Sequence, residues 1–240
     1  MKPTINIIWF RRDLRLSDNA ALYHALQSNY PVIPIFIFDK NILDKLSDKA
    51  DRRVEFIHAA LSEMQQQLVA MNTTMEVYYG YPLEVYKQLL EKYTIANVFT
   101  NHDYELYAIH RDAEIKNLLN ENGINFSTYK DQVIFEKNEV LKDDGKPYTV
   151  FTPYSRKWKD LFQKTKLEHF ESEKLLRNIV SHSYPFLSLK DINQPRSVEI
   201  MQAIEKVVAS GWYLHGAYTK QFEENYAKYI GVQHAIGVAN

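Results

Sequence analysis

The sequence predicts an α/β fold: a five-stranded parallel, doubly wound (Rossmann-like) sheet, with a short helical appendage at the C-terminal end. Two observations predict it. Five apolar, β-prone runs alternate with helical segments between residues 5 and 129, as in sheets covered by helices on both faces. Within the helical segments, apolar residues recur at every third or fourth position. Because crossovers between parallel strands are right-handed, we expect the strand order 3-2-1-4-5, with the switch point between the first and fourth strands.

The first expected strand, residues 5–10, is apolar and runs directly into a loop that carries arginines and aspartates. The loop ends on Asp18 and Asn19, which suit the N-cap of a helix over residues 20–26. A buried strand therefore delivers guanidinium and carboxylate groups to its own carboxyl end. In open α/β sheets this edge is where ligands bind.

The second and third expected strands flank a long helix. Residues 31–38 are β-branched and aromatic, and residues 74–79 form the next β-prone run. Between them, residues 51–71 carry an apolar stripe at steps of three and four, which predicts one amphipathic helix. Pro82 then suits the first position of a further helix, whose apolar residues share one face as far as Tyr93.

The last two expected strands are residues 97–100 and 124–129. The helix between them covers residues 105–122 and ends at Gly123, which suits the C′ position because glycine tolerates a left-handed backbone. With these two strands the predicted sheet is complete.

Beyond the sheet the sequence changes in character. Residues 143–147 form a strong turn signal. Residues 148–158 mix aromatic, hydroxyl and basic side chains, a combination found in nucleic-acid contacts, but we favour the interpretation that this segment packs over an edge of the sheet. Residues 181–197 contain two prolines and few helix formers, and we interpret them as a linker.

Two polar clusters are expected to meet at the switch point. One follows the first strand, at residues 11–15, and the other follows the fourth strand, at residues 101–105. Because the carboxyl ends of neighbouring parallel strands lie at one edge of the sheet, the two clusters predict a ligand site there. The alternative is that the arginines and carboxylates only pair with one another and hold the strand ends together.

Composition excludes several classes of protein. The formal net charge is -1 and there is no cysteine, so nothing global attracts the chain to nucleic acid or to a membrane surface, and disulfides and thiolate chemistry are excluded. The lack of a glycine-rich phosphate motif argues against an NAD-type enzyme or a P-loop NTPase. No apolar run approaches a membrane span and the N-terminus has no secretory pattern. We expect a cytoplasmic protein with no membrane partner, catalytic motif or metal site.

Residues 9–19, Trp-Phe-Arg-Arg-Asp-Leu-Arg-Leu-Ser-Asp-Asn, resemble the N-terminal signature of the DNA photolyase/cryptochrome family. The resemblance continues at residues 33–39, 101–105, 111–112, 145–154 and 158, and in a linker-like stretch at residues 184–192. Several motifs in the same order are a far more specific signal than one short pattern.

The resemblance implies a role. In that family the α/β domain holds an antenna chromophore, which is a folate, a deazaflavin or a flavin. A separate helical domain binds FAD, contacts DNA and repairs pyrimidine dimers by light-driven electron transfer. By motif position, the residues implied to line the antenna crevice are Arg11, Arg12, Arg53, Asp103 and Glu105. Guanidinium groups suit this role because they stack on flat rings and pair with anionic tails.

One departure from the family pattern bears on the cofactor. Folate-binding members carry an Asn-Glu pair at the positions of Tyr107 and Ala108. The resemblance therefore favours a flavin or deazaflavin, or an empty site, over a folate. The FAD-binding helical domain is absent from residues 1–240, so we expect DNA contact only through that domain and no photolyase activity from this chain alone.

The C-terminal residues resemble a different family. Residues 209–216, 222–223 and 229–240 are similar to the start of DegT-type sugar aminotransferases, which use pyridoxal phosphate (PLP). The resemblance places the phosphate-binding residues and the Schiff-base lysine beyond Asn240, so no PLP site is expected here. We expect two helices closed by Gly211 and Gly231, a strand over residues 235–238, and a tail that packs weakly on the α/β domain or stays mobile.

The expected organisation is a photolyase-type antenna domain over residues 1–135, a connecting segment and linker of the same family over residues 136–200, and a truncated aminotransferase-like fragment over residues 201–240. The junction is expected within residues 183–201. Three functional hypotheses stay open: a light-harvesting or repair-enzyme fragment, a non-catalytic nucleotide-binding module, and an aminotransferase partner whose tail donates helices to a dimer interface. The sequence predicts no oligomeric state and does not separate photolyase from cryptochrome.

Overall fold

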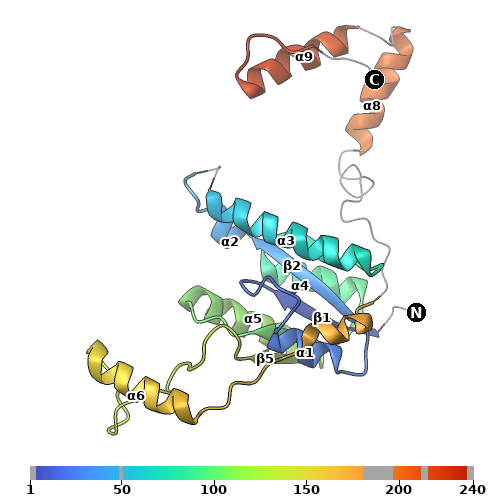
Figure 1. The fold of residues 1–240 in the computed structure, drawn as a ribbon. Helices are drawn as coiled ribbons and strands as arrows, with labels where there is room; N and C mark the ends of the chain where they lie inside the picture. The colour runs from blue at the N-terminus through green and yellow to red at the C-terminus, as the bar shows by residue number, and fades with distance from the viewer. Residues whose placement is uncertain (1–3, 49–50, 181–196, 212–215, 237–240) are drawn as a thin grey trace. The chain divides into compact units, whose positions relative to one another are not determined.

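The computed structural model describes residues 4–48, 51–180, 197–211 and 216–236. The chain divides into two compact units, Met1–Phe186 and Leu187–Asn240, and each is described by itself (Figure 1). The first unit contains the whole sheet. Most of the interval in which the sequence places the junction, residues 183–201, lies outside the described residues.

The first unit is built on one parallel sheet of five strands in the order β3-β2-β1-β4-β5, as the sequence predicts. The strands are β1 (Thr4–Phe10), β2 (Val32–Asp39), β3 (Glu76–Gly80), β4 (Thr94–Asn101) and β5 (Asn125–Tyr129). Ile7 of β1 lies opposite Ile33 of β2 and Val98 of β4, so β1 is central. The switch point therefore falls between β1 and β4.

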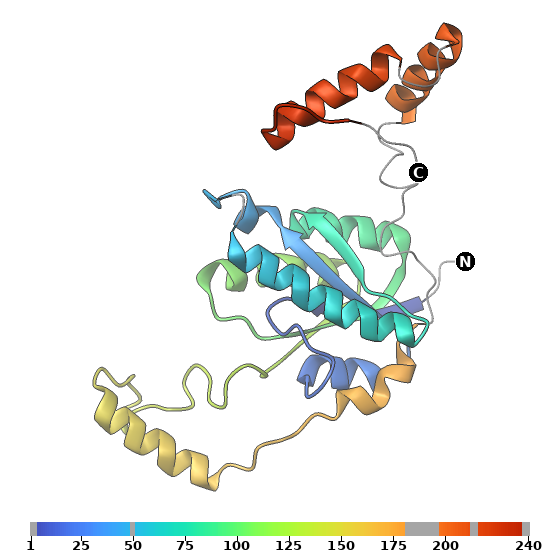
Figure 2. The same cartoon turned by 45° about the horizontal axis from the view of Figure 1, so that its top comes forward.

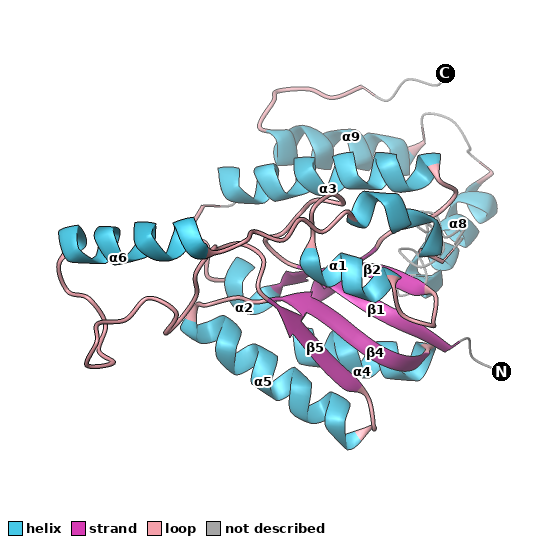
Figure 3. Ribbon diagram, turned by 60° about the horizontal axis from the view of Figure 1, so that its bottom comes forward, coloured by secondary structure: helices cyan, strands magenta, loops and turns pink. Residues whose placement is uncertain are grey.

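Five helices connect the strands: α1 (Ala20–Leu26), α2 (Lys40–Leu43), α3 (Arg52–Ala70), α4 (Pro82–Lys92) and α5 (Leu106–Glu121). The helices α1 and α3 cover one face of the sheet, and α4 and α5 cover the other (Figures 2 and 3). Two separate apolar cores result, because successive strand side chains point to opposite faces. Ile8 and Phe10 of β1 belong to the core under α1 and α3, while Ile7 and Trp9 belong to the core under α4 and α5.

The helix ends follow the local signals in the sequence. Asn19 caps α1, its side-chain oxygen accepting a hydrogen bond from the Leu22 N–H at 3.0 Å. Pro82 occupies the start of α4, and Gly123, just after α5, has φ 72°. Strand β4 is three residues longer at its start than expected, because Thr94 pairs with Thr4 before a register shift in β1. The preceding helix runs into β4 with no turn residue to mark the boundary.

The connecting segment after β5 does not pack as expected. Residues 151–164 form helix α6 (Phe151–Lys164), none of whose residues is buried. Its aromatic side chains contact one another and the preceding loop: the Trp158 ring lies 5.1 Å from Phe162 and 5.5 Å from Phe135. The prediction that this segment packs over an edge of the sheet is therefore wrong, because its aromatic residues line one stripe of a helix and meet other partners.

The chain then returns to the sheet through a 3₁₀ helix, η1 (Ser172–Asn178). Ile179 bridges to Val32 of β2, and the Thr73 hydroxyl donates to the Val180 carbonyl at 2.5 Å. These contacts bring the end of the described segment against the sheet. The expected linker from residue 181 onward lies outside the described residues, apart from residue 197.

The second unit contains helices α8 (Ser197–Ser210) and α9 (Ala217–Ile230). Gly211 and Gly231 follow them with φ 66° and 81°, so both expected helix ends are confirmed. The expected strand over residues 235–238 is wrong where it can be checked, because residues 235 and 236 have no strand partner; the rest of it lies outside the described residues. Among the described residues, no helix is long and apolar enough to cross a membrane, and no three metal-ligating side chains cluster.

Candidate functional site

A buried polar network joins the two strands at the switch point. Its members are Asp13 in the loop after β1, Asn19 at the start of α1, and Asn101 at the end of β4. Asn101 Nδ2 donates to Asp13 Oδ2 at 2.7 Å and to Asn19 Oδ1 at 2.9 Å, and Asn101 Oδ1 accepts from the Ala21 N–H at 2.9 Å. The side-chain polar atoms of these three residues therefore all have hydrogen-bond partners. The network fixes the loop after β1 against the end of β4, so the side chains that the loop carries are held in place.

Two arginines pack against the indole of Trp9. The guanidinium carbons of Arg11 and Arg111 lie 4.9 Å and 4.8 Å from its ring centroid. Arg11 Nη1 donates to both carboxylate oxygens of Asp112 at 2.6 Å, and Nη2 donates to the Asn101 carbonyl. Arg111 Nη2 donates to Asp112 Oδ1 at 3.0 Å. For Arg11 the structure supports the alternative that the charged groups pair with one another and hold the strand ends together. Its guanidinium is buried and fixes the end of β1 to α5.

A cavity of about 630 Å³ opens beside these arginines, at the carboxyl ends of β1, β2 and β4. We call it the arginine cavity. Its charged wall is formed by Arg11, Arg12, Arg52, Arg53, Arg111, Asp39, Asp103 and Glu105. Its apolar wall includes Leu14, Phe36, Phe38, Leu43, Leu46, Phe56 and Ile57. All five residues that the resemblance implies for an antenna crevice line this one cavity.

The five residues are not equally close to one another. Arg12 pairs with Glu105 and with Asp103 Oδ2 at 3.6 Å; the hydrogen bond to Glu105 raises the pKa of Arg12, and burial opposes it only in part. Arg53 lies at the start of α3 and pairs instead with Asp51. Its side-chain hydrogen bond lowers the pKa of Asp51 to about 2. The cavity thus has the Arg12–Glu105 ion pair on the α5 side and the Arg53–Asp51 ion pair at the start of α3.

Tyr107 and Asp39 are cavity residues that the sequence reasoning did not select. The Tyr107 hydroxyl donates to Asp39 Oδ2 at 2.6 Å and accepts from Asn41 Nδ2 at 3.0 Å. Burial, and then the bond to Asp39, raises the pKa of Tyr107 to about 12, so it stays protonated. The signal for Asp39 was its position at the carboxyl end of the second strand. Arg111 lies in the middle of α5, so no strand end marks it as a candidate site residue.

A doubly wound parallel sheet with a charged and apolar cavity at its switch point defines a ligand-binding α/β domain. The sequence profile of the DNA photolyase family matches residues 6–173, and the chain belongs to this family. A second profile, that of the DegT/DnrJ/EryC1/StrS aminotransferase family, matches residues 195–240.

Similar proteins agree with the first assignment. A deoxyribodipyrimidine photo-lyase from Synechococcus is 32% identical over 63% of this chain and 31% of its own length, and one from Vibrio cholerae is 33% identical over 66% and 34%. The crystal structure of an archaeal photolyase from Sulfolobus tokodaii with two FAD molecules is similar with a TM-score of 0.58 and 26% identity, over 75% of this chain and 43% of that one. This chain spans about a third of the length of the two curated relatives.

Proposed function

We propose that the arginine cavity holds a flat, light-absorbing cofactor, and that residues 1–135 are the antenna domain of a photolyase-type, light-dependent DNA repair system. The observation that carries the proposal is the cavity itself: one apolar wall and one wall rich in guanidinium groups, both facing the same space. A planar heteroaromatic ring with an anionic tail needs both.

The residues present fit such a cofactor. A volume of about 630 Å³ lies within the range that small-molecule sites occupy. Phe36, Phe38 and the leucines supply apolar surface for a ring, and guanidinium groups stack on rings and bind anionic tails. Arg12 and Arg53, whose side chains are 55% and 74% exposed, have donors left for a ligand, and exposed Arg52 lies on the same wall. Asp103 and Glu105 keep Arg12 in position.

We assign the cofactor to the flavin or deazaflavin class. Tyr107 and Ala108 stand where folate-binding members carry an Asn-Glu pair, and Tyr107 is committed to Asp39 and Asn41. The Sulfolobus tokodaii photolyase, which contains two FAD molecules, supports this class. When bound, the cofactor absorbs visible light; the chain's own residues exclude water from its ring and neutralise its tail.

Flavin titration tests the assignment. The purified chain is mixed with FMN or FAD, and binding is followed by the change in flavin fluorescence and by thermal stabilisation. Arg12→Ala should weaken binding about tenfold, because it removes a charge-assisted contact. Lys87→Ala, which removes a surface charge on α4 that pairs with Glu84, is the matched control. No binding of either flavin, or equal binding by the two variants, would contradict the proposal.

We assign DNA contact and dimer repair to a FAD-binding helical domain of the kind that the resemblance implies. The 240-residue chain should accordingly show no dimer repair under blue light when incubated with irradiated oligonucleotide. Repair by the purified chain would overturn this assignment but leave the flavin titration untouched.

The match of residues 195–240 to the aminotransferase family favours a second proposal for the tail. Its helices α8 and α9 expose apolar side chains, among them Met201, Ile204 and Phe222. We propose that this segment is an aminotransferase-type start that contributes helices to a subunit interface. Size measurement with and without residues 201–240 tests it: an unchanged mass in solution would count against an interface.

A further inference from the structure

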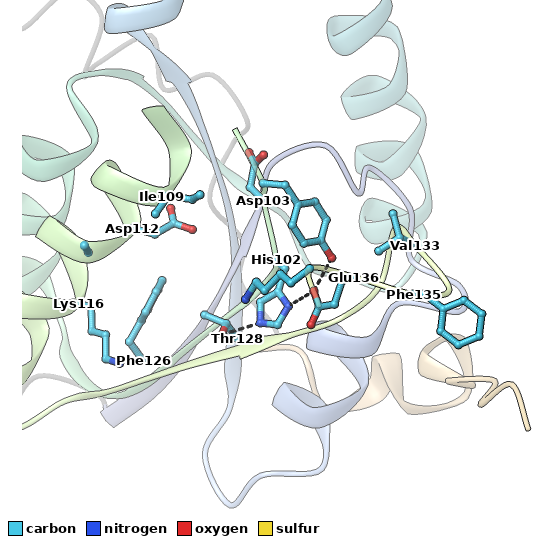
Figure 4. A pocket seen from close by; sticks show the side chains of 13 residues that line it. His102, Asp103, Ile109, Asp112, Lys116, Phe126, Thr128, Val133, Phe135 and Glu136 are labelled. Atoms are coloured by element: carbon cyan, nitrogen blue, oxygen red, sulfur yellow. Dashed lines mark hydrogen bonds and ion pairs between the residues drawn. The ribbon is translucent and has the colours of Figure 1, made fainter. Parts of the chain in front are cut away.

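A second cavity, of about 560 Å³, lies at the carboxyl ends of β4 and β5 (Figure 4). We call it the Lys116 cavity. Asp103 lines both cavities. Asp112 lines the Lys116 cavity but not the arginine cavity, while its partners Arg11 and Arg111 line the arginine cavity but not the Lys116 cavity. An ion-paired wall therefore separates the two spaces. The function proposed above uses only the arginine cavity, so the Lys116 cavity has no assigned role.

One side of the Lys116 cavity carries a hydrogen-bond relay. Glu136 Oε2 lies 2.8 Å from His102 Nδ1 and accepts from the Tyr104 hydroxyl at 2.6 Å, and His102 Nε2 lies 3.0 Å from Thr128 Oγ1. The dashed lines in Figure 4 follow the contacts of Glu136 and His102. Burial tends to raise the pKa of Glu136, but the bonds from Tyr104 and His102 outweigh it and lower that pKa. Glu136 is thus an ionised carboxylate, which can only accept hydrogen bonds.

The relay leaves an acceptor directed to the cavity. Since Glu136 can only accept, His102 Nδ1 carries the hydrogen, and in the neutral ring Nε2 is the acceptor. The Thr128 hydroxyl then donates its hydrogen to Nε2. Its oxygen keeps lone pairs for another partner, so a ligand that meets Thr128 is required to offer a donor, such as an amino group.

The rest of the cavity supplies an aromatic wall and a cation. Phe126 is two residues before Thr128 on β5, so the two side chains share one face of the sheet. Lys116 of α5 lies next to Phe126 in Figure 4. Among the described residues, Lys116 forms no ion pair. The carboxylate of Asp112, which lines the same cavity, is instead paired with Arg11 and Arg111. Lys116 is therefore an uncompensated charge beside Phe126, and, with Lys137 also in the lining, it favours an anion.

We propose that the Lys116 cavity binds a nucleoside monophosphate whose base carries an amino group. The amino group donates to Thr128 Oγ1, the base packs against Phe126, and the phosphate pairs with Lys116. The three features lie along one wall, and each selects a different part of the same ligand.

Isothermal titration calorimetry with AMP tests the proposal on the full chain. We expect AMP to bind, and both IMP, which has a carbonyl in place of the amino group, and adenosine, which has no phosphate, to bind about tenfold more weakly. Lys116→Ala should weaken AMP about tenfold and abolish the difference between AMP and adenosine. Thr128→Val, an isosteric change on a strand, should abolish the difference between AMP and IMP. Lys87→Ala should bind AMP as the native chain does.

Circular dichroism and thermal melting confirm that each variant is folded before titration. The titration is repeated with FMN in excess to separate this proposal from the one on the arginine cavity; AMP binding should be unchanged, whatever FMN itself does. No binding of AMP, loss of AMP binding when FMN is added, or native affinity in Lys116→Ala would each overturn the proposal.

Discussion

Asn101→Asp perturbs the polar network at the switch point with almost no change of shape. The substitution replaces the Nδ2 donor of Asn101 with a carboxylate oxygen. In the native chain that donor bonds to Asp13 Oδ2 at 2.7 Å and to Asn19 Oδ1 at 2.9 Å. Both bonds would be lost, and the new carboxylate would face that of Asp13, with the surrounding side chains buried.

The expected loss of stability follows from these contacts. The bond to Asn19 is worth about 1 kcal/mol and that to the charged Asp13 about 2 kcal/mol. Two carboxylates so close do not both stay ionised, and binding one proton at pH 7 costs up to about 4 kcal/mol for an ordinary aspartate pKa of about 3.9. A hydrogen bond between the two carboxyls returns part of this. We expect the free energy of unfolding to fall by about 4–6 kcal/mol at pH 7.

The pH dependence carries the sign of the charge effect. In the variant the carboxyl pair has one pKa raised above its unfolded value, so the protonated pair stabilises the fold at low pH and that contribution is lost as the pH rises. Between pH 7 and pH 5 the loss of stability should shrink by about 2–3 kcal/mol.

Urea unfolding followed by far-ultraviolet circular dichroism measures both quantities. Asn101→Ala is the control. It removes the same two hydrogen bonds and the acceptor for the Ala21 N–H but adds no charge, so its loss of unfolding free energy should be the same at pH 7 and pH 5. Two results would refute the expected repulsion between the two carboxylates. One is a loss of unfolding free energy below about 1 kcal/mol in Asn101→Asp, and the other is a loss that depends on pH no more than that of Asn101→Ala.

Two further substitutions test features away from the cavities. Glu76→Gln should lower the free energy of unfolding by about 2 kcal/mol at pH 7, because buried Glu76 accepts from Lys92 Nζ at 2.8 Å and from the Tyr93 hydroxyl at 2.5 Å. Burial tends to raise the pKa of Glu76, but the hydrogen bonds from Lys92, Tyr78 and Tyr93 outweigh burial and lower that pKa. Urea titrations should therefore show the loss of stability in Glu76→Gln shrinking below about pH 4, and a loss that stays constant with pH would contradict this. Gly123→Ala should lower the free energy of unfolding by about 1 kcal/mol. The loss comes from the backbone alone, because φ at Gly123 is 72° and no neighbour crowds a Cβ there. Gly123→Asn should lose less, and identical melting temperatures for the two variants would contradict this.

Much of the fold could be predicted because it depends on neighbours in the chain. The order of the strands follows from the alternation of strands and helices, and the ends of α1 and α5 follow from Asn19 and Gly123. Prediction failed where tertiary contacts decide. The start of β4 is set by pairing with Thr4, and the aromatic stripe of α6 meets Phe135 instead of the sheet.

The candidate site divides in the same way. The sequence places Arg12, Asp103 and Glu105 at the ends of adjacent central strands, and the structure brings them together. It also shows that Arg11 is largely committed to Asp112, 101 positions away in the chain, and that Tyr107 closes part of the arginine cavity. Neither fact has a local signal, since both partners lie on elements that meet only after the sheet has formed.

What the sequence by itself determined is the kind of sheet and the edge at which ligands bind, because periodicity and strand order are properties of neighbouring residues. Only the tertiary structure decided which charges at that edge are neutralised and which stay available. Asp112 is neutralised by Arg11 and Arg111, and this pairing lies between the arginine cavity and the Lys116 cavity. Such compensation depends on distances between side chains far apart in the chain, and these distances are fixed by packing.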